Sequence, residues 1–381
     1  MRSRLSGFAL MGLFASTPVL RAQEPMADPS VQFAHEVEAT IARRDASFLD
    51  GSFDRNAFYD RITGGIDAPD GFARGFRSSF DKSFTFGERV LMTALKDGGT
   101  YQFLRIRENP KRALFRLVSG EGALNYHELE LVRTPSGAVG VQDVYVYTTG
   151  EYLSETVKRI YLSGVAQANR GFLERLQGKD ELLIKHLEEV QTMSQAMQSG
   201  EGAKALSIYR ALPPELQRQK IILLTRIGAA AQVDDTEYER AMAAYQEAFP
   251  RAPELALIVF DRYFLKGEYA KVLELLDQLE TSVGGDPYLD VLRSSTFTAA
   301  GDLQRARAVS EKAVAAAPDM ENAYFALLNV GLAFDEHALT ADTLDRLSER
   351  FGYTWQLEGQ PDYASFLASD EGKRWLQSNR Q

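Results

Sequence analysis

A recurring step of 34 residues in the second half of the sequence constrains the fold more than any other feature. Gly267 and Gly301 each follow an apolar helical stretch and stand one step apart, and a further step reaches Asp335 in another turn-like segment. Self-similarity at a fixed period of this length is typical of proteins built from stacked helical units. Strand patterns also vanish in this half, so the sequence predicts an all-α array of repeats over residues 181–350.

The residues around Gly301 explain why such a unit folds as two packed helices. Phe297 precedes the glycine by four positions, Ala306 and Ala313 follow it by five and twelve, and Pro318 follows it by seventeen. Small side chains let the two helices approach closely, glycine adopts the turn conformation between them, and proline ends the second helix because it has no amide hydrogen. This spacing resembles that of the tetratricopeptide repeat family, whose unit is a helix–turn–helix.

The resemblance covers about five units and implies an α-solenoid whose concave face is made by the first helix of each unit. The match is incomplete, because Ser310 and Gly331 stand where the family usually has large aromatic side chains. An irregular helical bundle is therefore the alternative. Residues 351–381 contain Phe366 and Trp375, and we expect them to form a C-terminal helical cap over the open end of the array.

The first half of the chain has a different periodicity. Amphipathic helices are predicted over residues 31–50 and 71–94, and another from about residue 152. Between them the hydrophobic period changes to two, with turn signals at each break, which indicates four strands in an antiparallel meander. This order predicts an α+β domain over residues 31–162, with helices packed on a curved antiparallel sheet. The predicted strands span residues 101–108, 112–119, 125–133 and 139–147.

The order of elements in residues 31–160 also resembles the nuclear-transport-factor-2-like superfamily, which is defined by shape and not by a sequence motif. The resemblance implies a curved sheet partly wrapped by helices, in some members with a pocket between them. His127 on the third strand, with Asp143 and Tyr145 on the fourth, would be the polar groups of such a pocket, and the first two could exchange a proton. The alternative is that His127 and Asp143 face solvent or make local hydrogen bonds.

The first residues have the organisation of an export signal. Arg2 and Arg4 precede a mostly apolar run, and Ala22 is a small residue suited to a cleavage site. We therefore expect residues 1–22 to be a cleaved signal peptide and the mature chain, from about Gln23, to be periplasmic or secreted without stable membrane insertion. An uncleaved anchor is the alternative. Cleavage removes three arginines and changes the formal net charge from −10 to −13.

Composition excludes several function classes. The chain has no cysteine, which rules out disulfides, thiolate metal sites and thiol catalysis. Its 43 basic and 53 acidic residues argue against a nucleic-acid partner, since phosphate binding needs a basic surface. Four scattered histidines leave little material for a metal site, and there is no phosphate-binding loop, zinc-protease or serine-hydrolase motif. The sequence therefore predicts no metal, no cofactor and no enzymatic activity.

The function that these features predict is the binding of another protein or peptide, for interaction or assembly, through the concave face of the solenoid. The alternative is a small-ligand or enzymatic pocket in the α+β domain, with the repeats as a scaffold, and a purely structural assembly factor is a third possibility. The candidate partner-binding residues are aromatic or hydrogen-bonding side chains spaced along three units. They are Asp261, Phe264, Tyr288, Phe325 and Asn329.

Overall fold

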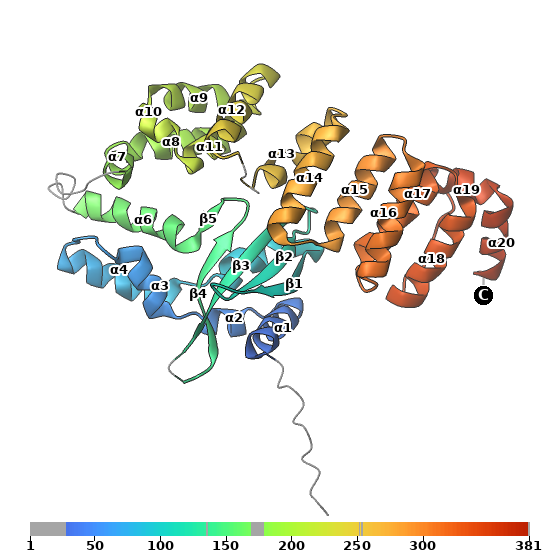
Figure 1. The fold of residues 1–381 in the computed structure, drawn as a ribbon, viewed down its shortest axis with the longest axis horizontal. Coiled ribbons are helices and arrows are strands. Elements are labelled where there is room, and N and C mark those ends of the chain that lie inside the picture. Colours follow the sequence, from blue (N-terminus) through green and yellow to red (C-terminus); the bar gives the residue numbers. More distant parts are fainter. Residues whose placement is uncertain (1–27, 135, 169–178, 251, 253, 380–381) are drawn as a thin grey trace, which may run out of the picture.

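The computed structural model describes residues 28–134, 136–168, 179–250, 252 and 254–379. The predicted signal peptide at residues 1–22 lies outside the described residues. The described part consists of an α+β region followed by a helical region, so the predicted order of the two structural classes is confirmed (Figure 1). No helix in this part is long and apolar enough to cross a membrane.

A five-stranded antiparallel sheet forms the centre of the α+β region. The strands follow the chain in the order β1-β2-β3-β4-β5, so each pairs with its sequence neighbour. This is the predicted meander, with strand ends within one residue of those expected from the alternating pattern, and β5 is a short addition. The strands are β1 (Thr100–Arg107), β2 (Arg112–Val118), β3 (Leu124–Arg133), β4 (Val139–Val146) and β5 (Glu151–Tyr152).

Two of the helices predicted in this region need correction. The helix expected over residues 31–50 breaks where Arg44 takes a left-handed conformation, with φ at 61°. The helix expected over residues 71–94 ends at Ser83, because Phe84 is extended and its ring packs among neighbouring phenylalanines. The helices are α1 (Pro29–Ala42), α2 (Ser47–Gly51), α3 (Arg55–Thr63), α4 (Asp70–Ser83), α5 (Met92–Ala94) and α6 (Leu153–Ala168), with a π-helical turn at Gly87–Leu91 and a 3-10 turn at Lys96–Gly98.

The helical region consists mainly of helix pairs joined by short turns. Helix α8 packs on α9, α11 on α12, α13 on α14, α15 on α16 and α17 on α18, and α15 also packs on α17 in the next pair. The helices are α7 (Lys179–Lys185), α8 (Leu187–Gln198), α9 (Gly202–Ala211), α10 (Pro214–Gln217), α11 (Lys220–Ala230), α12 (Asp235–Ala248), α13 (Glu254–Leu265), α14 (Tyr269–Val283), α15 (Pro287–Ala299), α16 (Leu303–Ala316), α17 (Glu321–Ala333), α18 (His337–Phe351), α19 (Ala364–Ala368) and α20 (Asp370–Ser378).

The C-terminal residues cover the last helix pair. Phe366 of α19 and Trp375 of α20 are buried in the same apolar cluster as Leu344 and Leu347 of α18. The Trp375 indole also donates a hydrogen bond to Asp345 at 2.7 Å. These contacts bury a face of α18 that would otherwise be exposed at the C-terminal end of the helical region.

The sheet makes apolar contacts on both faces. On one face Phe115 and Leu129 belong to a core that includes residues of α1–α4 and α6. On the other face Tyr126 and Tyr147 belong to a second core that extends from α7 to α15. The sheet is therefore a middle layer between its own helices and the helical region (Figure 1).

The same turn closes three successive helix pairs. Gly267, Gly301 and Asp335, which stand 34 residues apart, have φ angles of 72°, 76° and 54°. In each turn the amide of the next residue donates to the carbonyl five positions before it, with an N···O distance of 2.9 Å. This hydrogen bond is typical of a helix that ends in a left-handed residue. The period in the sequence thus corresponds to a repeated local structure.

Small side chains lie where paired helices touch. Ala306 and Ala313 are fully buried, and the Ser294 hydroxyl of α15 donates to the Ala306 carbonyl of α16 at 3.3 Å. Gly331 explains one departure from the repeat pattern. A Cβ at this position would lie 2.6 Å from Thr340 Oγ1, so α17 and α18 approach too closely there for a large side chain.

Replacing Ala306 by leucine is expected to destabilise the chain by about 1–3 kcal/mol, because the added side chain has no room between α15 and α16. Urea unfolding followed by circular dichroism measures this change. Ala308→Leu is the matched control, since Ala308 is exposed on the same helix and should tolerate the same substitution. Equal stability of the two variants would show that the α15–α16 contact is not tightly packed at Ala306.

Candidate functional site

His127 lies on the sheet face that packs against α1–α4 and α6. Its buried ring sits between Phe86 and Tyr101, with centroid separations of 5.4 and 5.7 Å. Nε2 lies 3.2 Å from the Asn125 amide nitrogen, whereas Nδ1 has no hydrogen-bond partner among the described residues. Burial lowers the pKa of the imidazole to about 3. His127 is therefore a neutral part of the core at physiological pH.

Asp143 and Tyr145 lie on the opposite face, so the predicted pocket that combines them with His127 is wrong. The register between β3 and β4 shifts so that Glu130 pairs with Asp143 while Leu131 pairs with Val141. The extra residue in β4 is a β-bulge, which reverses the side to which the following side chains point. The simple alternation assumed from the sequence misses this reversal.

Asp143 is part of a buried polar cluster. Arg61 of α3 donates to Asp143 at 3.1 Å and to both carboxylate oxygens of Glu130 at 2.9 and 3.0 Å. Ser154 donates its hydroxyl to Asp143 at 2.5 Å. Burial raises the pKa of Asp143, and hydrogen bonds from Ser154 and Arg61 oppose this effect. For Glu130 burial also raises the pKa, but Arg61, Gln142 and Arg112 together outweigh this effect, so the pKa is lowered. The cluster ties α3 and α6 to the sheet.

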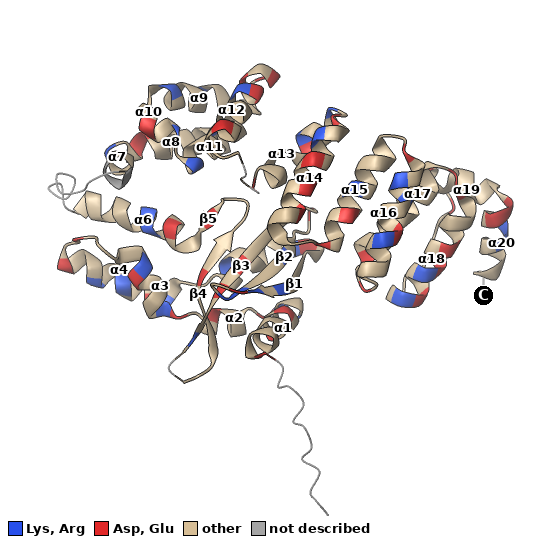
Figure 2. Ribbon diagram, in the orientation of Figure 1, with Lys and Arg blue, Asp and Glu red and all other residues tan. Residues whose placement is uncertain are grey.

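Arginines of β1 and β2 attach the same sheet face to the turn between α14 and α15. Figure 2 shows basic residues in blue on these strands, close to that turn. Arg105 and Arg107 donate to the carbonyls at the C-terminal end of α14, where the helix dipole favours positive charge. Arg116 and the Tyr126 hydroxyl bind the buried carboxylate of Asp286 at 2.5 and 2.8 Å. Asp286 also caps the N-terminus of α15. The sheet and the helical region are therefore joined by a buried network.

This junction buries one of the predicted partner-binding residues. Tyr288 is only 6% exposed, and the Arg116 guanidinium lies 5.0 Å from its ring centroid. The prediction that Tyr288 lines an open groove is wrong, because the sheet of the same chain covers this part of the helical surface.

The other four predicted residues are accessible to different degrees. Asp261 is exposed on α13, and Phe264 is half-buried against a neighbouring phenylalanine. Phe325 of α17 is half-buried, with its ring 5.3 Å from that of Tyr353 in the C-terminal segment. Asn329 is exposed on α17 and lines a cleft. Asp261 and Asn329 are thus the exposed members of the set, and Asn329 also lines a cleft.

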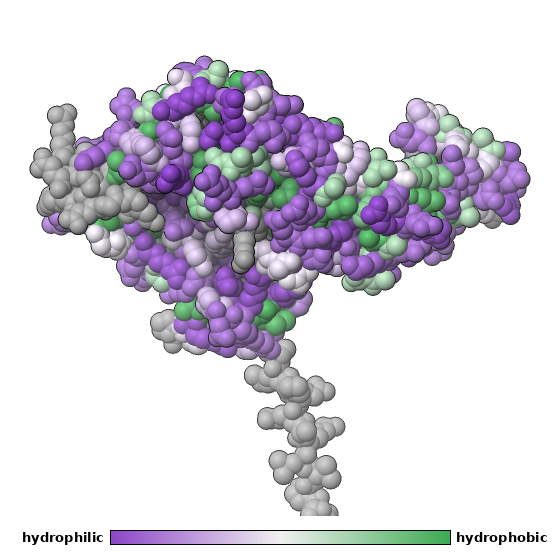
Figure 3. Space-filling model, turned by 45° about the horizontal axis from the view of Figure 1, so that its top comes forward, coloured by the Kyte–Doolittle hydropathy of each residue, from purple (hydrophilic) through white to green (hydrophobic). Residues whose placement is uncertain are grey.

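The cleft beside Asn329 lies between α15, α17 and the C-terminal segment, and its volume is about 460 Å³. Its walls are mostly small or uncharged, and Asp362 supplies a carboxylate at one side. Hydrophobic surface is visible among the C-terminal helices at the right of the space-filling view (Figure 3). The lining includes Ser295, Thr298, Ala299, Asn329, Leu332 and Asp362.

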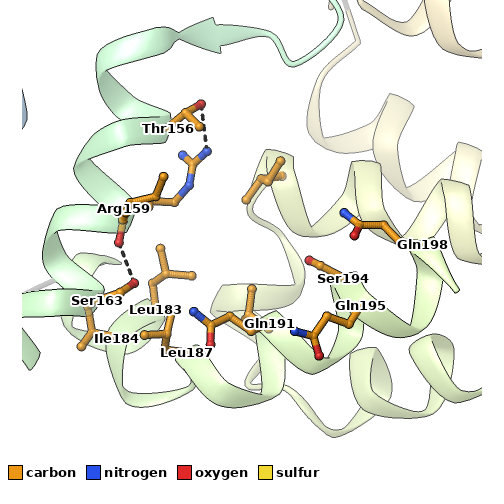
Figure 4. Close-up of a pocket in the computed structure, with 13 residues that line it drawn as sticks. Thr156, Arg159, Ser163, Leu183, Ile184, Leu187, Gln191, Ser194, Gln195 and Gln198 are labelled. Atoms are coloured by element: carbon orange, nitrogen blue, oxygen red, sulfur yellow. Dashed lines mark hydrogen bonds between the residues drawn. The ribbon is translucent and has the colours of Figure 1, made fainter. Parts of the chain in front are cut away.

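A second groove, of about 520 Å³, lies between α6 of the α+β region and α7 and α8 of the helical region (Figure 4). Aliphatic side chains form its floor, and three glutamines of α8 lie along one wall. It shares Arg159, Leu183 and Ile221 with a neighbouring cleft of about 540 Å³ that is rich in charged residues. The floor includes Leu183, Ile184, Leu187, Val190 and Ile221, and the glutamines are Gln191, Gln195 and Gln198.

Sequence reasoning missed this second groove. The recurrence of glutamine at positions 191, 195 and 198 places three amides on one face of a helix, and this spacing is visible in the sequence. What faces those amides is set by α6, which lies in the other region of the chain. Comparison of the chain with protein-family models, curated proteins and solved structures finds no match.

Proposed function

We propose that this chain is an exported, non-enzymatic protein of the tetratricopeptide repeat type, and that it mediates protein–protein interaction or assembly through the first helices of its repeat units. The recurring left-handed turns and the buried alanines of α16 support the repeat assignment. The packing of α15 on α17, the first helices of successive pairs, supports a stacked array.

The observation that carries the proposal is the open cleft between α15 and α17. Ala299 is exposed at one side of the cleft, and Asn329 presents an exposed amide that can both donate and accept a hydrogen bond. The backbone of an extended polypeptide offers one donor and one acceptor at most residues, so it can pair with such an amide. The cleft lies beyond the part of the array that the sheet covers.

A variant with arginines at two cleft positions, Ala299→Arg with Asn329→Arg, is expected to lose at least about tenfold in partner binding, because two long side chains fill the cleft. The test captures partners with the mature chain, starting near Gln23, from the envelope fraction of its own source. The matched control is Gln304→Arg with Ala308→Arg on the exposed face of α16. If the cleft variant keeps its helix content and retains the partner fully, the cleft is not the binding surface.

A further inference from the structure

We propose that the groove between α6 and α8 is a second binding site, which takes an extended peptide segment with aliphatic side chains and an acidic residue. The groove is lined by residues of α6, α7, α8 and α11, so it is separate from the α15–α17 cleft. It would therefore be a binding site in addition to the cleft of the proposed function. Binding to it can be measured independently of binding to that cleft.

The floor of the groove can take aliphatic side chains. Leu183 is buried, Leu187, Val190 and Ile221 are half-buried, and together they present an apolar surface. Ile160 on α6 lies at the other wall and is 63% exposed, which is unusual for a large aliphatic side chain. A ligand that covers these residues removes apolar surface from water, which favours binding.

The glutamines of α8 match the spacing of an extended backbone. Gln191 and Gln195 are one helical turn apart, about 6 Å along the helix axis, and alternate residues of an extended strand are about 6.7 Å apart. Figure 4 shows the side chains of Gln191, Gln195 and Gln198 along the hollow. Within the described part of the chain these amides form no hydrogen bond with another residue, so their donors and acceptors are available.

The neighbouring cleft provides the contact for an acidic side chain. Its cations are more exposed than the carboxylates that pair with them: the Lys220 side chain is 28% exposed and that of Glu254 is 0% exposed. The side chains of Arg61 and Arg159 are likewise more exposed than those of the carboxylates with which they pair. The lining of this cleft holds four cations, Arg61, Lys158, Arg159 and Lys220, and two carboxylates, Glu151 and Glu155. The lining therefore has more positive than negative side chains, which favours a ligand with an anionic group.

A free fatty acid also combines an apolar part with an anionic end. In that complex the glutamine amides would lie against a hydrocarbon chain and would lose water without gaining a hydrogen bond. A peptide backbone supplies the missing partners at the matching interval. The hydrogen-bonding capacity of the α8 glutamines therefore favours a peptide over a fatty acid as the ligand.

The probe is a fluorescein-labelled synthetic peptide, Leu-Ser-Leu-Ser-Leu-Glu-Glu, with blocked ends, and its binding to the full chain is followed by fluorescence anisotropy. Gln191→Leu with Gln195→Leu keeps the size of the wall and removes two amides, so we expect about tenfold weaker binding. Gln246→Leu with Gln304→Leu, which changes two exposed glutamines on α12 and α16, is the control and should bind as the unchanged chain does. Ile160→Glu should weaken binding at least as much, because it places a like charge beside the acidic residues of the peptide.

The opposite results overturn the proposal. Equal or tighter peptide binding by the Gln191→Leu, Gln195→Leu chain would show that the wall does not pair with a backbone. Palmitate binding that is unchanged in this variant, together with no peptide binding at about 1 mM, would assign the groove to an acyl chain instead. The Ala299→Arg, Asn329→Arg chain should bind the peptide normally, so loss of the α15–α17 interaction and loss of this site give different results.

Discussion

Asp286→Ala is expected to destabilise the folded chain by about 3–5 kcal/mol, because it leaves the Arg116 guanidinium buried without its carboxylate. The side chains of Arg116 and Asp286 are 4% and 0% exposed, and their N···O distance is 2.5 Å. The same substitution also removes the acceptor of the Tyr126 hydroxyl and the N-cap of α15. Urea unfolding monitored by circular dichroism measures the loss.

Asp302→Ala measures the cost of losing a helix N-cap without losing a buried ion pair. Asp302 caps α16 in the same way but at a more exposed position, so its loss should cost clearly less than the loss of Asp286. Replacing both members of the buried pair, Arg116→Met with Asp286→Leu, should recover part of the stability, since no unpaired charge remains. A cost for Asp286→Ala no larger than that for Asp302→Ala would mean that the buried pair does not hold the sheet to the helical region.

Acid is expected to destabilise the α+β region through His127. Its pKa is lowered to about 3 in the folded chain, so the unfolded chain binds an extra proton as the pH falls below about 6.5. The contribution of His127 to the free energy of unfolding is therefore complete at neutral pH. It decreases as the pH falls toward the folded-state pKa. Between pH 7 and pH 4.5 the expected loss from this residue alone is about 2–3 kcal/mol.

His127→Phe isolates that contribution, because phenylalanine keeps an aromatic ring beside Phe86 and Tyr101 and does not titrate. The free energy of unfolding should fall less between pH 7 and pH 4.5 in this variant than in the unchanged chain. His35→Gln is the control, since the side chain of His35 is 61% exposed. Identical pH dependence in the His127→Phe and unchanged chains would contradict the proposed cause.

The parts of the fold that the sequence predicts well are determined by residues that are close together in the sequence. The alternation in residues 101–147 identifies the strands because successive side chains of a strand point to opposite faces. The 34-residue step identifies the turns at Gly267, Gly301 and Asp335, because a left-handed residue and its capping hydrogen bond are formed within one short segment. Both patterns arise within short stretches of sequence. They can therefore be recognised without knowing which helices or strands pack against them.

The candidate sites were harder to predict, as Asp143 shows. Its face depends on a bulge that is defined by pairing between β3 and β4, and the alternation within β4 alone points to the wrong side. The exposure of Asn329 on α17 is a more local property, and the structure places this residue at the edge of a cleft. The α6–α8 groove was not found, because its two walls come from different regions of the chain.

The sequence by itself determined the two structural classes, the meander and the period of the helical turns. The tertiary structure alone decided that the sheet lies against α14 and α15, and therefore that Tyr288 is buried while the cleft beside Asn329 is open. Arg116 and Asp286 are 170 positions apart, and nothing in the residues near either one identifies the other as its partner. Such a pair forms only when the two regions pack, because a buried charge must find its counter-charge wherever the fold brings one.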